Sequence, residues 1–305
     1  MNSADENLPA FLICVEHGRL EGEAILLVES LRAWGGACAQ APVYAFAPRP
    51  GLHPEPATIE RLEDLAVRVI EEPLVAERFA DEPTLNKIAV SAWAERELDH
   101  EILVFTDTDS IFLGEPRELM EGDWVAAARP VDRRIAGSRG KGKNEPYWRK
   151  MYDELGVQGS PFVRTAVGDQ EIRAYWNSGL LAARRSAGLF DAWERAITQL
   201  FDADLVPNKW PNFMDQLSWA AVTADHHDRV RILSVAYNYP LRHRASLSPE
   251  AIELDLADLV HMHYRLWFHM PDSLPKVNPP FDPGSDRYAW LAERVPLQPI
   301  VEEGE

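Results

Sequence analysis

Two aspartates, Asp107 and Asp109, stand two positions apart, shortly after the apolar run 102–105. In an extended chain the side chains of residues i and i+2 point to the same side, so both carboxylates can bind one hard divalent cation. The apolar run is typical of a strand that is buried on both faces of a parallel sheet. Such sheets bind ligands at the carboxyl ends of their strands, where the two aspartates would lie. The alternative is a plain solvated turn, because Asp and Ser favour turns.

Two histidines could complete a metal site. We predict a late strand over residues 258–264, and His261 and His263 share one of its faces. A neutral imidazole beside two carboxylates suits Mn²⁺, which accepts mixed nitrogen and oxygen ligands. The alternative is a pair of packed histidines whose ring nitrogens bond to the backbone. His261 is slightly favoured as the ligand because it follows the apolar pair Leu259-Val260. The tyrosine that follows His263, Tyr264, favours His263 instead.

The elements that must position these residues alternate between strand and helix through the first half of the chain. We predict strands over 11–15, 42–47, 66–70 and 102–105, and helices over 21–34, 57–65 and 84–98. This alternation predicts an α/β fold with a mostly parallel central sheet, right-handed crossovers and flanking helices. No Gly-x-Gly-x-x-Gly follows the first strand, and no P-loop motif occurs anywhere, so ordinary dinucleotide-binding and P-loop folds are disfavoured.

The second half differs in character. A strand over 124–128 precedes a Gly-, Lys- and Arg-rich segment that we expect to be a loop as far as Lys150, and a turn leads into a strand over 175–183. Helices are predicted over 187–201 and 212–223. We expect a single domain over 1–270, followed by a proline-rich tail over 271–305 that wraps over the body.

Composition excludes several classes of protein. The chain has 305 residues, of which 46% are hydrophobic and 26% charged, as in an ordinary globular protein. Its net charge of −18 argues against general nucleic-acid binding, because phosphate backbones would be repelled. No apolar stretch is long enough to span a bilayer and the N-terminus lacks signal-peptide features, so we expect a cytoplasmic protein without a transmembrane segment. Cys14 and Cys38 are expected to be small core residues in a reducing compartment.

Four separated segments resemble one known family. They are the helix 20–34 that runs into Gly35-Gly36, the segment from Lys87 to Phe-Thr-Asp-Thr-Asp at 105–109, Trp-Asn-Ser-Gly at 176–179, and Asp215-Gln216 with the later His-x-His strand. In this order they resemble the GT-A fold glycosyltransferases, in particular the family 8 group that includes glycogenin and bacterial lipooligosaccharide galactosyltransferases. The chain departs from that family after the histidines, where Arg265 to His269 replace the usual Gly and Lys-Pro-Trp.

The resemblance implies that residues 1–270 are a catalytic domain with a nucleotide-binding half (11–128) and an acceptor and metal half (129–270). It also implies an activity. It implies a metal-dependent hexosyltransferase that moves a sugar from a nucleotide-diphosphate sugar, with UDP as the favoured nucleotide, to an unknown acceptor with retention of configuration. A divalent ion, Mn²⁺ or Mg²⁺, would neutralise the departing diphosphate. The alternatives are a sugar-nucleotide nucleotidyltransferase and an inactive nucleotide-sugar-binding protein. The chain lacks the phosphate loop that the former needs after its first strand, and the intact Asp-x-Asp speaks against the latter.

The resemblance also implies roles for single residues. Asp109 would bind the metal, and Asp107 would share the metal or hydrogen-bond the ribose of the donor. The remaining expectations are a phosphate or acceptor contact for Lys87, close approach of the donor sugar at Asn177 and Gly179, contacts near the anomeric carbon for Asp215 and Gln216, and a nucleobase site beside Glu16 and His17. The plain alternatives are a solvated helix lysine for Lys87, a tight turn for Asn177 and Gly179, and a helix-surface acid for Asp215. For Glu16 and His17 the alternative is an exposed loop, which is favoured.

One basic segment remains outside these motifs. Residues 129–150 carry eight basic and two acidic side chains, a net charge of +6 on a chain of net charge −18. The segment is either a solvated flexible loop or a lid that orders over an anionic ligand. A lone positive region on an acidic surface steers anions, so we expect it to cover the diphosphate or to receive a phosphorylated or carboxylated acceptor.

Overall fold

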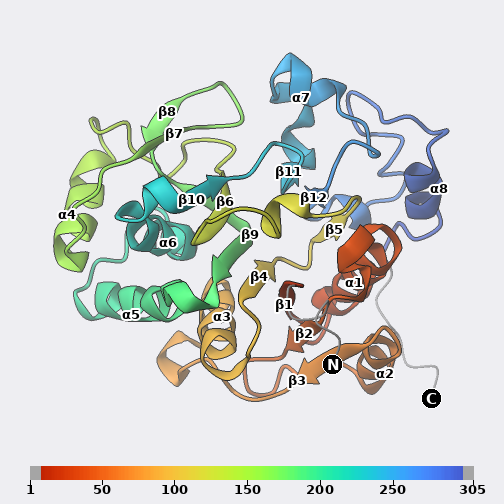
Figure 1. Ribbon diagram of the computed structural model, residues 1–305, viewed down its shortest axis with the longest axis horizontal. Coiled ribbons are helices and arrows are strands. Elements are labelled where there is room, and N and C mark those ends of the chain that lie inside the picture. The colour runs from red at the N-terminus through yellow and green to blue at the C-terminus, as the bar shows by residue number, and fades with distance from the viewer. Residues whose placement is uncertain (1–7, 298–305) are drawn as a thin grey trace.

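The computed structural model describes residues 8–297 (Figure 1). A seven-stranded sheet with the order β10-β6-β9-β4-β1-β2-β3 lies at its centre. The first 7 residues, on which the expectation about a signal peptide rests, and the last 8 of the predicted tail fall outside the described residues. Among the helices of residues 8–297, none combines the length and apolar character that crossing a bilayer requires.

The first half of the chain forms the parallel part of the sheet. Its elements are β1 (Ala10–Cys14), α1 (Arg19–Trp34), β2 (Val43–Phe46), α2 (Pro56–Asp64), β3 (Val67–Ile70), α3 (Asn86–Glu97) and β4 (Ile102–Thr106). β1 pairs in parallel with both β2 and β4, and β2 pairs in parallel with β3. The predicted alternation and the predicted fold class are therefore confirmed.

Both faces of this sheet are buried, which explains the unbroken apolar runs. Along β1, Leu12 joins the core cluster that includes α3, α5 and α6, whereas Phe11 and Ile13 join the cluster that includes α1 and α2. Successive side chains of a strand point to opposite faces, so each strand contributes to two cores.

The second half completes the sheet with three strands, of which one, β9, is reversed. Its elements are β6 (Ala126–Pro130), α4 (Glu145–Leu155), β7 (Phe162–Arg164), β8 (Glu171–Arg173), β9 (Trp176–Arg184), α5 (Leu189–Asp202), α6 (Met214–Ala224) and β10 (Val230–Ile232). β9 lies antiparallel between β4 and β6, so four of the six strand pairings in the large sheet are parallel. The reversal places the amino end of β9 beside the carboxyl end of β4.

The expected loop as far as Lys150 is wrong at its end, because α4 begins at Glu145. Trp148, Met151 and Tyr152 of this helix are buried in the core. Burial of this apolar face stabilises the helix, whereas the glycine-rich composition just before it had suggested a loop.

A small second sheet joins two distant parts of the chain. It has the order β11 (Tyr239–Pro240), β12 (His261–His263) and β5 (Ser110–Phe112). β12 runs antiparallel to β5, and His263 lies opposite Ser110. The histidine strand therefore lies directly beside the segment that follows the two aspartates.

The C-terminal segment packs against this small sheet. It contains α7 (Pro249–Glu253) and α8 (Asp286–Ala292). Phe281 and Leu291 from the predicted tail are buried in one core cluster with Leu26 of α1 and Met262 of β12. As far as residue 297, the tail supplies buried side chains to the core.

Candidate active site

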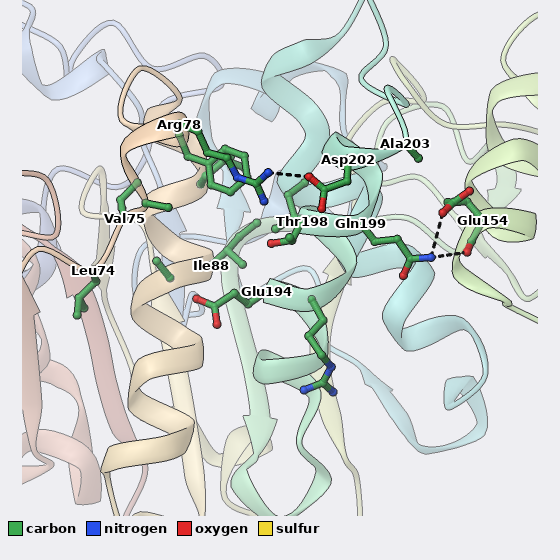
Figure 2. A pocket seen from close by; sticks show the side chains of 16 residues that line it. Leu74, Val75, Arg78, Ile88, Glu154, Glu194, Thr198, Gln199, Asp202 and Ala203 are labelled. Carbon is green, nitrogen blue, oxygen red and sulfur yellow. Dashed lines mark hydrogen bonds and ion pairs between the residues drawn. The ribbon is translucent and has the colours of Figure 1, made fainter.

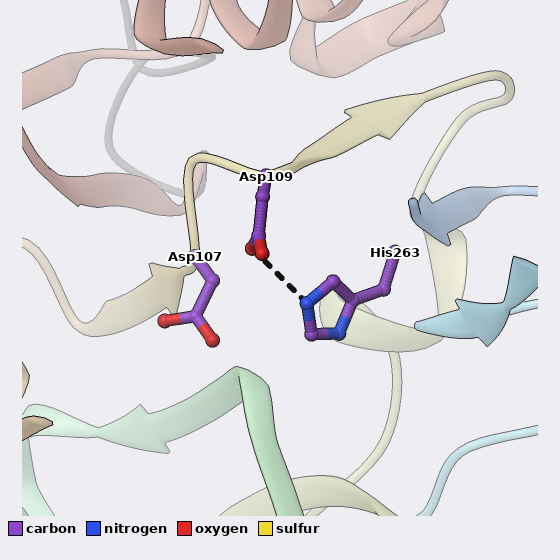
Figure 3. A group of neighbouring side chains, drawn as sticks. All are labelled: Asp107, Asp109 and His263. Atoms are coloured by element: carbon purple, nitrogen blue, oxygen red, sulfur yellow. Dashed lines mark ion pairs between the residues drawn. The ribbon is translucent and has the colours of Figure 1, made fainter. Parts of the chain in front are cut away.

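Asp107, Asp109 and His263 form a cluster at the carboxyl end of β4 (Figure 3). One ligand atom from each residue lies within 4.8 Å of the others. Asp107 and Asp109 come from the turn between β4 and β5, and His263 comes from β12, which pairs with β5. Two carboxylates and one imidazole are a donor set that suits Mn²⁺, and the carboxylates also suit Mg²⁺.

Asp109 and His263 form an ion pair, with 3.0 Å between Oδ1 and Nε2. Burial opposes charge on Asp109, but the positive charge and hydrogen bond of His263 outweigh it and lower the pKa of Asp109. Burial likewise opposes charge on His263, and Asp109 reverses this effect and raises the pKa of His263. A divalent cation would replace the proton on His263 and keep the same two side chains together.

His261 lies outside this cluster. Its Nε2 is 3.0 Å from Oγ1 of Thr106 and 2.9 Å from Oγ of Ser110, and the ring is completely buried. Burial, with a smaller contribution from the charge of His263, lowers the pKa of His261 to about 3. The structure therefore groups His263 with the two aspartates, whereas the sequence favoured His261 slightly.

Lys87 lies between Asp107 and Asp215 and contacts both carboxylates. Its Nζ is 2.7 Å from Oδ1 of Asp107, 3.5 Å from Oδ2 of Asp215 and 3.2 Å from Oγ of Ser178. Ser178 in turn donates to Oδ2 of Asp215 at 2.6 Å. Burial alone would lower the pKa of Lys87, but the carboxylates of Asp107 and Asp215 raise it. Lys87 is thus a buried cation of the site, and the reading as a solvated helix lysine is wrong.

Asp215 keeps one free carboxylate oxygen. The residue is 2% exposed, and within residues 8–297 no protein group bonds to its Oδ1. Burial raises the pKa of Asp215, although Lys87 and Ser178 oppose this rise. A buried polar oxygen without a protein partner is the kind of group that a bound ligand or a water molecule satisfies.

Asn177 and Gly179 lie in the first part of strand β9, so the alternative of a plain tight turn is wrong. Oδ1 of Asn177 accepts the backbone N–H of Gly179 at 2.9 Å and Nδ2 of Asn238 at 3.0 Å. A Cβ atom on Gly179 would lie 2.9 Å from Nδ1 of His263 and 3.1 Å from Oδ1 of Asn177. Glycine is required here by close approach to the histidine.

A cavity of about 430 Å³ opens beside the cluster, and Asp107, Asp109 and Lys87 line it. Its other wall holds Glu16, which is buried and bonded to Nε of Arg49 at 3.0 Å and to Nδ2 of Asn86 at 3.1 Å. The expected exposed loop is therefore wrong for Glu16.

His17 does lie on the surface, with 56% of its side chain exposed, although it also lines the cavity. Its Nδ1 is 3.1 Å from Oε1 of Glu55.

Asn177 lines a second cavity, of about 370 Å³. Gln216, at the start of α6, lines it together with Arg133, Arg242 and Arg265. The neighbours Asp215 and Gln216 thus have different surroundings, since Asp215 contacts Lys87 and Ser178.

A larger cavity, of about 640 Å³, lies elsewhere, between the segment 74–89 and α5 (Figure 2). Its charged rim is engaged in contacts such as Arg78 with Asp202 at 2.6 Å and Gln199 with Glu154 at 3.0 Å. None of the cluster residues lines it. Its walls carry no converging free carboxylates or metal ligands, so we place the chemistry in the smaller cavity beside the cluster.

Sequence reasoning missed several residues of this region. Arg49, Asn86 and Ser178 contact Glu16 or Lys87, and Glu23 of α1 is fully buried beside Arg19 and 2.8 Å from Nε2 of His269. Burial raises the pKa of Glu23 to about 8 despite Arg19. The inward position of Glu23 on its helix could have indicated this residue from the sequence. Arg49 and Asn86 could not be found in this way, because their roles depend on contacts between distant parts of the chain.

The comparisons with known proteins agree with this arrangement. The model of a family described as the Rhodobacterales glycosyltransferase domain matches residues 11–226. A search of curated proteins finds no match.

Among solved structures, a galactosyltransferase LgtC in complex with donor and acceptor sugar analogues is similar, with a TM-score of 0.55, 14% identity and coverage of 96% of this chain and 98% of that one. The WbbM bifunctional glycosyltransferase has a TM-score of 0.50 and 12% identity, and the match covers 97% of this chain and 53% of that one. Mouse xyloside xylosyltransferase 1 has a TM-score of 0.49, 12% identity and coverage of 84% and 97%.

Proposed function

Because the chain belongs to the family of the Rhodobacterales glycosyltransferase domain, we propose that it transfers a sugar from a nucleoside diphosphate sugar with the help of a divalent cation. Its class as a glycosyltransferase and its GT-A fold, which it shares with LgtC, are confirmed. The metal, a UDP-sugar donor and retention of configuration belong to the proposal. The expected cytoplasmic location stays a prediction.

The observation that carries the proposal is the cluster of Asp107, Asp109 and His263 at the mouth of the 430 Å³ cavity. Mn²⁺ or Mg²⁺ held by these side chains would stabilise the negative charge of the departing diphosphate. The far wall of the cavity, with Glu16 held by Arg49 and Asn86, offers fixed polar groups to the nucleoside.

The protein's own residues then position the donor sugar. Lys87 holds Asp107 in place and balances the charge of Asp215. The unpartnered Oδ1 of Asp215 would accept a hydrogen bond from a sugar hydroxyl or stabilise positive charge at the anomeric carbon. Asn177 accepts the backbone N–H of Gly179, where the lack of a side chain lets His263 approach the backbone and would let the sugar do so.

The test is a screen of nucleotide sugars for hydrolysis, with UDP-glucose, UDP-galactose, UDP-N-acetylglucosamine and GDP-mannose as donors, in Mn²⁺ or Mg²⁺ and in excess chelator. We expect one UDP-sugar to be hydrolysed and the chelator to abolish the reaction. Asp109→Asn should reduce hydrolysis to background, and Asp64→Asn, an exposed aspartate on α2, should not. Unchanged hydrolysis in chelator, or in Asp109→Asn, contradicts the metal-dependent mechanism.

A further inference from the structure

The 370 Å³ cavity has a strongly cationic wall. Arg133, Arg242 and Arg265 line it, and they come from three separate segments: the loop after β6, the short helix η9 (Leu241–Ser246) and the residue pair after β12. Asn177 and Gln216 line the same cavity, so the three guanidinium groups lie beside residues of the proposed sugar site.

The acid that lines this cavity does not neutralise the three arginines. Asp132 pairs with the buried Arg129, with 2.5 Å between Oδ1 and Nη2, and Arg129 also donates to the carbonyl oxygen of Asn238 at 3.1 Å. Within residues 8–297, no carboxylate lies within 4.0 Å of the guanidinium groups of Arg133, Arg242 or Arg265. The cavity therefore keeps an uncompensated positive charge on a chain of net charge −18.

His243 lines the same cavity as the three arginines. Burial is the main cause that lowers the pKa of His243, Asp132 opposes this shift, and the charges of Arg133, Arg242 and Arg265 add to it. All three arginines are therefore near enough to His243 to act on its charge.

The wall is also fixed to the metal cluster. Arg265 has a φ of 54°, an uncommon backbone conformation for a residue with a side chain. Its backbone N–H donates to the carbonyl oxygen of Asp109 at 3.2 Å. This bond holds the start of the arginine side chain at the boundary between the metal cluster and the cavity.

We propose that this cavity binds the acceptor and that the acceptor carries a phosphate or a carboxylate, which Arg133, Arg242 and Arg265 recognise; the inference rests on the proposed function. Guanidinium groups bind both anions with paired, charge-assisted hydrogen bonds. Tyr175 and Phe213 line the cavity as well and provide an apolar wall against which a sugar ring packs. Negative charge on the rest of the protein repels anions, so this cavity is where an anionic acceptor would be steered.

The test measures binding by calorimetry at low ionic strength with three probes: glucose 6-phosphate, glucuronate and glucose. The first two separate a phosphate from a carboxylate as the recognised group. We expect at least one of them to bind about tenfold or more tightly than glucose, the factor expected from one hydrogen bond to a charged group. Arg133→Gln combined with Arg242→Gln should remove this preference.

The matched control is Arg68→Gln combined with Lys276→Gln, which removes the same charge from two exposed positions outside both the cavity and the basic segment 129–150. Equal binding of all three probes, no binding of any, or an equal loss in the control variant overturns the inference. Displacement of the anionic probe by UDP with Mn²⁺ also overturns it, because the arginines would then hold the donor. Donor hydrolysis by the unmodified protein is measured in parallel, and its absence contradicts the proposed function independently of the probe result.

Discussion

Nζ of Lys87 lies 2.7 Å from Oδ1 of Asp107, so an aspartate that we propose as a metal ligand is already paired with a buried cation. Lys87 itself lies between Asp107 and Asp215. Without the lysine, two carboxylates would remain close together and partly desolvated, and without the carboxylates the lysine would be buried unpaired. The same ion pair therefore stabilises the site and holds a proposed metal ligand, Asp107, in place.

Lys87→Met should destabilise the protein by about 3 kcal/mol, because it leaves the carboxylates of Asp107 and Asp215 without their counter-charge. Urea unfolding measures this loss. Lys150→Met, at an exposed position of α4, is the matched control and should leave the midpoint unchanged. Adding Asp215→Asn to Lys87→Met should restore part of the stability, and a purely additive double variant would contradict the proposed coupling.

His263→Ala should raise the metal concentration needed for half-maximal donor hydrolysis by about tenfold or more, because it removes a ligand of the proposed site. His261→Ala should leave that concentration almost unchanged and should lower the unfolding temperature, since His261 bonds to Thr106 and Ser110 in the core. Metal titrations of both variants compare the two. A larger shift in metal affinity for His261→Ala would assign the ligand to that histidine.

Gly179→Ala should weaken metal binding even though residue 179 is no ligand. The new methyl group would lie 2.9 Å from Nδ1 of His263, so the imidazole must shift, and its position relative to Asp109 would change. Gly284→Ala provides the comparison, because its methyl group would meet only the carboxylate of the exposed Asp282, at 3.3 Å. If metal titrations of the two variants agree, the close approach at Gly179 does not position His263.

Glu145 should stabilise the folded protein at neutral pH and lose this contribution in acid. Paired hydrogen bonds from Arg173, with a further bond from Ser138, lower the pKa of Glu145 from 4.5 to about 2. A lowered folded-state pKa stabilises the protein above the unfolded value of 4.5, and this contribution is lost as the pH falls toward 2.

We therefore expect Glu145→Gln to cost about 2 kcal/mol at pH 7 and clearly less at pH 3. Thermal unfolding at both pH values checks this expectation. Glu171→Gln, at an exposed position of β8, should show no such difference. A cost for Glu145→Gln that is the same at both pH values would argue against the role of the charged hydrogen bonds.

The sequence predicted the parallel half of the fold well, because buried parallel strands and their crossover helices have distinct periodicities. It did not predict that β9 runs antiparallel between β4 and β6, since periodicity carries no information about strand direction. The start of α4 was also missed. The spacing of Trp148, Met151 and Tyr152 is helical, but the glycines and basic residues before them outweighed it.

The residues of the candidate site were likewise predicted only in part from the sequence. Asp107, Asp109 and a histidine strand could be predicted, because their order and spacing are local features. The grouping of His263 with the two aspartates depends on the register between β12 and β5, which places His263 opposite Ser110. The arginine wall of the second cavity draws on three distant segments, so the sequence indicated a basic region but not its members at Arg242 and Arg265.

The pairing of β5 with β12 also determines when during synthesis the proposed metal site can form. β5 ends at Phe112, and its partner strand begins at His261. A nascent chain that has emerged from the ribosome as far as residue 240 can pair β1 to β4, but His263, the third residue of the proposed site, has not yet been made. Truncated chains that end before β12 therefore contain both aspartates without the histidine, and the proposed metal-dependent activity requires this late strand.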